Sequence, residues 1–160
     1  MTDRMNAMSA SVDSANRASE RLKVLFLCTG NSCRSQMAEG WARRLLGEKV
    51  DAYSAGLKAH GLNRVAVQVM LDAGVDISAY RSKTIERMRE VDFDYVVTVC
   101  DGAHEACPIF PGKAKVIHHG FDDPPRLAAM ATTEEDALAV YTRVRDEIRD
   151  FILVLPTLLT

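Results

Sequence analysis

The sequence predicts an α/β fold, a four-stranded parallel sheet with helices on both faces. Short apolar runs the length of a buried strand alternate along the chain with longer segments of helical spacing. Strands joined through such helical segments pair in parallel. The 160 residues, 48% of them hydrophobic, suffice for one core and hardly for two. We therefore expect a single domain over residues 21–160.

Residues 1–20 are rich in Ser, Ala, Asn and Asp and have no clean hydrophobic period, which predicts a disordered N-terminal extension. The expected strands cover residues 21–27, 50–54, 95–99 and 115–118. The expected helices cover residues 35–46, 63–73, 84–89 and about 132–155. Gly47 and Gly74 mark two helix ends, Thr132 with Glu135 predicts a capping box, and Pro156 follows the last helix.

The stretch from Cys28 to Ser35 joins the first strand to the first helix and predicts an anion site. The unpaired N–H groups of a helix start and the planar Arg34 guanidinium both suit a tetrahedral oxyanion. The same field favours a nucleophilic thiolate at Cys28, and the Ser35 hydroxyl is placed to donate to that sulfur or to cap the helix. The alternative is a structural Cys followed by a turn. The candidate substrate-binding residues are Thr29, Gly30, Asn31, Ser32, Cys33, Arg34 and Ser35.

A second thiol, Cys100, ends the third strand, so we expect it at the same sheet edge as Cys28. Cys107 follows seven residues later. A helix would separate the two Cα atoms by about 10 Å along its axis, whereas a disulfide needs roughly 7 Å or less. A bond between them therefore requires this segment to loop out, which Asp101-Gly102 and Pro108 favour. Two alternatives are inert core cysteines and a zinc site with His104 and either His118 or His119.

Two carboxylates, Asp122 and Asp123, lie in a turn after the fourth strand. An acid there could protonate a leaving oxygen, or the segment could be an Asp-Pro turn and nothing more. His60, in the loop 58–62, could form part of the rim of the site or be merely solvated.

The segment from Cys28 to Trp41 resembles the phosphate loop of the low-molecular-weight protein tyrosine phosphatase superfamily, and within it the thioredoxin-coupled arsenate reductases. The segment around Cys100 and Cys107 is also similar to that branch, and the resemblance runs from about residue 22 to 148. It implies a flavodoxin-like three-layer sandwich. It also implies an acid directly before a proline, which selects Asp123 and leaves Asp122 as a turn former or helper.

The resemblance implies reduction of arsenate to arsenite, with Cys28, Arg34, Cys100, Cys107 and Asp123 as catalytic residues. Cys28 attacks arsenic while Asp123 protonates the departing hydroxide. The oxidation then passes to a Cys28–Cys100 disulfide and on to Cys100–Cys107, which thioredoxin or a similar dithiol protein reduces. Phosphate and sulfate would bind as arsenate analogues.

Three alternatives stay open. A phosphatase would hydrolyse a phosphocysteine at Cys28, although Pro125 stands where the phosphatase pattern has an aromatic residue. A redox or metal sensor would use Cys100 and Cys107 without turnover. Cys33 could instead pair with Cys28 as a protective disulfide.

The composition argues against nucleic acid and membranes as partners of this protein. A formal net charge of -2 gives no basic excess for nucleic acid, and the longest apolar stretch, residues 151–155, is far too short for a bilayer. The N-terminus lacks a signal-peptide h-region, so we expect a cytoplasmic location. We further expect a monomer without a bound cofactor or metal. Some family members bind potassium through Asn, Glu, Ser and Asp. Asn31, Glu39 and Ser54 match three of these positions, but Lys83 at the fourth argues that its ammonium replaces the ion.

Overall fold

The computed structural model describes residues 21–102, 110 and 112–159. Its centre is a parallel sheet of four strands, β1 (Leu22–Cys28), β2 (Val50–Gly56), β3 (Tyr95–Thr98) and β4 (Lys115–His118). The strands lie in the order β2-β1-β3-β4, which makes β1 and β3 interior. This arrangement confirms the predicted fold class.

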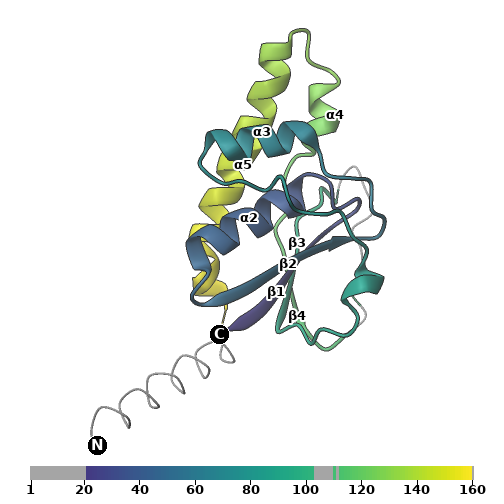
Figure 1. Ribbon diagram of the computed structural model, residues 1–160, viewed down its shortest axis with the longest axis vertical. Coiled ribbons are helices and arrows are strands. Elements are labelled where there is room, and N and C mark those ends of the chain that lie inside the picture. The colour runs from purple at the N-terminus through teal and green to yellow at the C-terminus, as the bar shows by residue number, and fades with distance from the viewer. Residues whose placement is uncertain (1–20, 103–109, 111, 160) are drawn as a thin grey trace, which may run out of the picture.

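Helices lie on both sides of the sheet (Figure 1). The helices α2 (Arg34–Leu46), α3 (Arg64–Asp72) and α5 (Glu134–Val154) pack on one face, and the short α4 (Pro124–Ala128) packs against α5. The 3₁₀ helix η1 (Ile85–Met88) lies on the other face, and η2 (Leu155–Leu158) follows α5.

Alternation along β1 divides the core into two clusters. Val24, Phe26 and Cys28 join the large cluster under α2 and α5, whereas Leu25 and Leu27 join a smaller one on the side of η1. Successive side chains of a strand point to opposite faces of the sheet. Because one core cluster covers each face, every residue of β1 from Val24 onward is buried. The run therefore delivers Cys28 to the sheet edge with its side chain on the face that α2 covers.

Two local predictions were wrong in detail. The N-cap of α5 is Thr133, whose hydroxyl accepts the Asp136 N–H at 3.0 Å, rather than Thr132 with Glu135. The helix α4 was not predicted, and it begins with two adjacent prolines, Pro124 and Pro125. They occupy its first turn, where proline is tolerated because those N–H groups need no helical partner.

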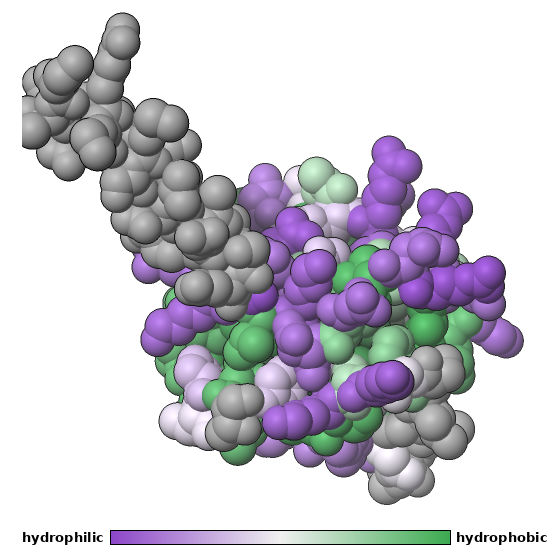
Figure 2. All heavy atoms as spheres, turned by 90° about the horizontal axis from the view of Figure 1, so that it is seen from below, coloured by the Kyte–Doolittle hydropathy of each residue, from purple (hydrophilic) through white to green (hydrophobic). Residues whose placement is uncertain are grey.

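Hydrophobic and hydrophilic side chains are mixed on the surface seen from below (Figure 2). Its hydrophobic clusters are interrupted by hydrophilic side chains. None of the described helices combines the length and the apolarity that crossing a bilayer requires.

The buried face of α5 should carry much of the stability. Ile148 is fully buried in the large cluster, so Ile148→Ala should lower the free energy of unfolding by about 2–5 kcal/mol, as measured by urea denaturation. The matched control is Leu153→Ala on the same helix, where the side chain is 56% exposed and a change within about 0.5 kcal/mol is expected. Equal losses in the two variants would contradict this account of the core.

Candidate active site

Cys28 ends β1 at the base of a loop that leads directly into α2. Its sulfur lies 2.8 Å from the Ser35 hydroxyl oxygen, and both groups are buried. Ser35 is inside α2, whose N-cap is Cys33, so it does not cap the helix as one alternative had proposed. The first turn of α2 carries no acidic side chain, which leaves the positive end of the helix dipole free to act on the sulfur.

The loop between Cys28 and α2 holds its carbonyl groups outward. The carbonyls of Thr29, Gly30 and Ser32 accept the N–H groups of Lys58, His60 and Asn63 at 3.0–3.1 Å. The Asn31 carbonyl accepts the Gln36 side-chain amide at 3.1 Å, and the Cys33 carbonyl accepts the Met37 N–H at 2.9 Å. The oxygen and the hydrogen of a trans peptide point in opposite directions, so the N–H groups of residues 30–34 face the inside of the loop. Such a nest binds anions.

Asn31 fixes both the shape of the loop and the direction of the Ser35 hydrogen bond. Its φ of 47° lies in the left-handed region, which Asn tolerates better than most residues. Its side-chain oxygen accepts the Lys83 N–H at 2.9 Å and the Gln36 amide at 3.0 Å, so its NH₂ group is turned to Ser35, 2.8 Å away. Because the Ser35 oxygen already accepts this bond, its own hydrogen is available to the Cys28 sulfur.

Behind the loop, a buried carboxylate is surrounded by cations. Glu39 accepts the Ser54 hydroxyl at 2.7 Å and pairs with Arg43 at 3.0 Å and Lys83 at 3.5 Å. The Lys83 ammonium also donates to the Arg81 carbonyl at 3.1 Å and to Ser54 at 3.3 Å. Burial lowers the pKa of Lys83, and the neighbouring Glu39 partly offsets that effect. The Lys83 ammonium therefore occupies the space among Glu39, Ser54 and the Arg81 carbonyl.

Arg34 and Asp123 face each other across the mouth of the loop. The Arg34 guanidinium is buried, donates to the Phe121 carbonyl at 3.2 Å and lies 3.5 Å from an Asp123 carboxylate oxygen. Asp122 turns away instead and pairs with Arg143 of α5 at 2.9 Å. The structure thus brings Asp123, and not Asp122, to the site. A cavity of about 380 Å³ opens here, lined by Cys28, Thr29, Gly30, Ser32, Cys33, Arg34, His60, Asn63, Asp123 and Pro125.

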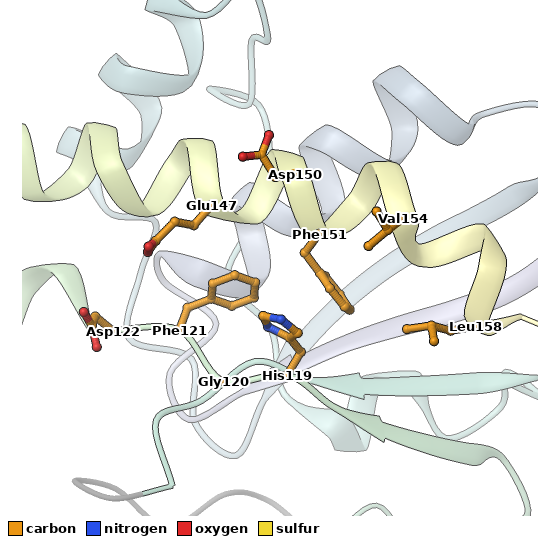
Figure 3. A pocket seen from close by; sticks show the side chains of 9 residues that line it. All are labelled: His119, Gly120, Phe121, Asp122, Glu147, Asp150, Phe151, Val154 and Leu158. Atoms are coloured by element: carbon orange, nitrogen blue, oxygen red, sulfur yellow. The ribbon is translucent and has the colours of Figure 1, made fainter.

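A stack of aromatic rings anchors the segment that carries Asp123. The His119 ring lies between Phe121 and Phe151 of α5, with centroid distances of 4.7 and 4.3 Å (Figure 3). A second cavity of about 570 Å³ adjoins this stack, with the carboxylates of Asp122, Glu147 and Asp150 along it. Its lining has no lysine or arginine, so it does not suit an anion.

The cysteines differ in state. Cys28 and Cys33 are free thiols, so the protective disulfide between them is not formed in this structure. Burial raises the pKa of Cys33, which keeps it a thiol although Arg34 acts in the opposite direction. Cys100 is disulfide-bonded, a state that removes it from any zinc site. His104 and Cys107 lie outside the described residues.

The structure places Cys100 at the same sheet edge as Cys28, but Cys100 does not line the cavity. The Val99 N–H donates to the Leu27 carbonyl at 3.0 Å, so both cysteines follow neighbouring strands at one sheet edge, as expected. Cys100 is fully buried, however, and lines neither the cavity nor the cluster around Cys28. In this state the Cys100 sulfur therefore does not line the cavity that holds the Cys28 sulfur.

Several residues of the site had no sequence signal of their own. Gln36 is buried among hydrogen bonds to the loop, and Asn63 both caps α3 and donates to the Tyr141 hydroxyl at 3.1 Å. An Asn before a helical segment predicts a cap, but its contact with a residue 78 positions away does not follow from sequence. His60, which the sequence placed at the rim of the site or in solvent, lines the cavity.

Comparisons with known proteins agree on the kind of molecule. Residues 23–151 match the family described as low molecular weight phosphotyrosine protein phosphatase. The arsenate reductase of Bacillus subtilis (strain 168) is 51% identical over 125 residues, which are 78% of this chain and 88% of that protein. The arsenate reductase of Halalkalibacterium halodurans is 50% identical with the same coverage, 78% and 88%. A solved arsenate reductase in the phosphate binding state has a TM-score of 0.69 at 29% identity, covering 87% of this chain and 99% of that one.

Arg34 should dominate anion affinity. Arg34→Lys keeps the charge but loses the planar fork, so phosphate binding measured by calorimetry should weaken about 10- to 100-fold, the equivalent of one charge-assisted hydrogen bond. Arg149→Lys on the exposed side of α5 is the control and should bind phosphate like the unchanged protein. Undiminished affinity in Arg34→Lys would show that the nest alone holds the anion.

Proposed function

Because the chain belongs to the low molecular weight phosphotyrosine protein phosphatase family and its close relatives are arsenate reductases, we propose that it reduces arsenate to arsenite through three cysteines. One observation carries the proposal. Cys28 is a free thiol at the base of an anion cavity, while Cys100, at the end of the neighbouring strand, is already oxidised to a disulfide. A purely hydrolytic enzyme has no need of that second, oxidisable sulfur.

The first step is attack on the bound anion. Arsenate resembles phosphate in shape and charge, so the N–H groups of residues 30–34 and the Arg34 guanidinium hold its oxygens. The Ser35 hydroxyl lies 2.8 Å from the Cys28 sulfur and orients it, and the sulfur displaces one oxygen from arsenic. Asp123, 3.5 Å from Arg34 at the cavity mouth, protonates the departing hydroxide.

The second step moves the oxidation out of the cavity. Cys100 attacks the Cys28 sulfur, arsenite leaves with the electron pair of the S–As bond, and a Cys28–Cys100 disulfide remains. Cys107 then exchanges with it to give Cys100–Cys107, and Cys28 is free again. A free Cys28 beside an oxidised Cys100 is the arrangement expected after this step.

The relay requires a change of conformation. Cys100 does not line the cavity in its disulfide-bonded state, so its sulfur must come closer to Cys28 when it is reduced. That movement would present the final disulfide to an external dithiol protein of the thioredoxin kind. A supply of such dithiols fits the reducing cytoplasm expected from the sequence.

A phosphatase activity has its own support in the same cavity. Cys28, Arg34 and Asp123 are the groups that a phosphocysteine route needs, and the family model is that of phosphatases. Pro125 lines the cavity mouth where the phosphatase pattern has an aromatic residue that would pack against an aryl phosphate. We therefore expect only slow hydrolysis of aryl phosphates.

Removing the second sulfur separates the two activities. Cys100→Ser should abolish multiple-turnover arsenate reduction with thioredoxin, because the oxidation has no route out of the cavity. Slow hydrolysis of p-nitrophenyl phosphate should persist in this variant and vanish in Cys28→Ser, which serves as the control for cavity chemistry. Sustained arsenate turnover by Cys100→Ser, followed as arsenite produced, would refute the relay.

The cation around Glu39 is supplied by the chain itself, so potassium should have little effect. The Lys83 ammonium lies among Glu39, Ser54 and the Arg81 carbonyl, which leaves these residues poorly suited to a potassium ion. Exchanging potassium for sodium at fixed ionic strength should leave the reduction rate unchanged. Lys83→Met should become sensitive to that exchange and lose about 1–3 kcal/mol of stability. Strong specific activation of the unchanged protein by potassium would contradict this assignment.

A further inference from the structure

His60 lies against the anion loop and lines the same cavity as Cys28. Its main-chain N–H donates to the Gly30 carbonyl at 3.0 Å. Its ring packs so closely on Gly30 that a Cβ added there would meet the imidazole Nδ1 at 2.4 Å. The residue is nevertheless exposed, so solvent reaches the imidazole.

The proposed reaction needs more protons than one acid supplies. Arsenate is mainly a dianion at neutral pH, and arsenous acid is neutral. The Cys28 thiol passes its proton to the bound arsenate as its sulfur attacks, and the Cys100 thiol passes its proton to an arsenic-bound oxygen as it forms the disulfide. With these two protons, the dianion needs two further protons to give arsenous acid, one water and one disulfide. Arsenic gains two electrons and the two sulfurs lose one each. One of the two further protons passes through Asp123, and the other needs a second donor.

The cavity offers few candidates for that donor. Its titratable lining residues are Cys28, Cys33, Arg34, His60 and Asp123. Cys28 is the nucleophile, Arg34 stays protonated, and burial raises the pKa of Cys33 so that it holds its proton. His60 is left, and histidine is the side chain suited to give a proton near neutral pH.

Resting on the proposed function, we propose that His60 is the second proton donor of arsenate reduction. When the Cys100 sulfur attacks the Cys28 sulfur, an S–S bond forms, the S–As bond breaks and its electron pair stays on arsenic. The imidazolium gives its proton to an oxygen on arsenic in this step. Neutral arsenous acid then leaves, and the exposed imidazole regains a proton from solvent.

Single-turnover kinetics test this role. Fully reduced protein is mixed with arsenate in the absence of any reductant, and arsenite release is followed by rapid quench. His60→Ala should slow release about 10²-fold while its inhibition constant for phosphate stays unchanged. Added imidazole should restore part of the rate, because the shortened side chain leaves room at an exposed position. His60→Gln should be equally slow, since an amide donates a hydrogen bond but transfers no proton.

Two controls sharpen the result. Imidazole should not accelerate the unchanged protein, nor Asp123→Asn, in which the other donor is missing. Normal arsenite release by either His60 variant, or a loss in His60→Ala that follows weakened phosphate binding and ignores imidazole, would overturn the assignment and leave the proposed function standing. An unchanged protein that releases no arsenite would overturn both.

Discussion

The site depends on the outward direction of five successive carbonyl groups, those of residues 29–33. N–H groups from residues 58–63, from the Gln36 side chain and from the first turn of α2 donate to these carbonyls. The opposite N–H groups of the loop are therefore turned inward. A positive cradle therefore results from backbone geometry, and the side chain of Arg34 only completes it. The close approach continues at Gly56, where an added Cβ would lie 2.7 Å from the Asn31 nitrogen. The end of β2, the loop and its support consequently form one packed unit.

The described cysteines differ in their surroundings and in their oxidation state, and their positions in the fold determine these differences. Cys28 and Cys33 both belong to the loop. The Cys28 sulfur lies 2.8 Å from the Ser35 hydroxyl oxygen, whereas burial raises the pKa of the Cys33 thiol. Cys100 follows the neighbouring strand and is oxidised. Parallel pairing brings the ends of β1 and β3 together, and strand alternation then decides which face each side chain meets. The sheet thus places three cysteines in different chemical environments within a few residues of one edge.

Sequence patterns predicted the sheet and the loop because both depend on local regularities, a buried apolar run and a strand followed by a helix start. The strand 115–118 was placed correctly to the residue. The errors lie where tertiary contacts decide. Thr133 rather than Thr132 caps α5, and the short helix α4 was not predicted. The rim position of His60 was predicted, but the hydrogen bonds that hold the segment 58–63 against the loop do not follow from sequence. Lys83 was predicted to replace a cation, but its bond from the main chain to Asn31 was not foreseen.

Asn31 illustrates how little freedom such a loop leaves to evolution. Glycine would accept the left-handed backbone but would break the bridge from Lys83 and Gln36 to Ser35. Aspartate has the same outline, yet it offers Ser35 no N–H and would bring a negative charge toward the anion loop. Larger side chains meet the steric penalty of a positive φ. One position thus combines a backbone demand with two opposite hydrogen-bonding demands, and asparagine alone among the twenty amino acids meets all three.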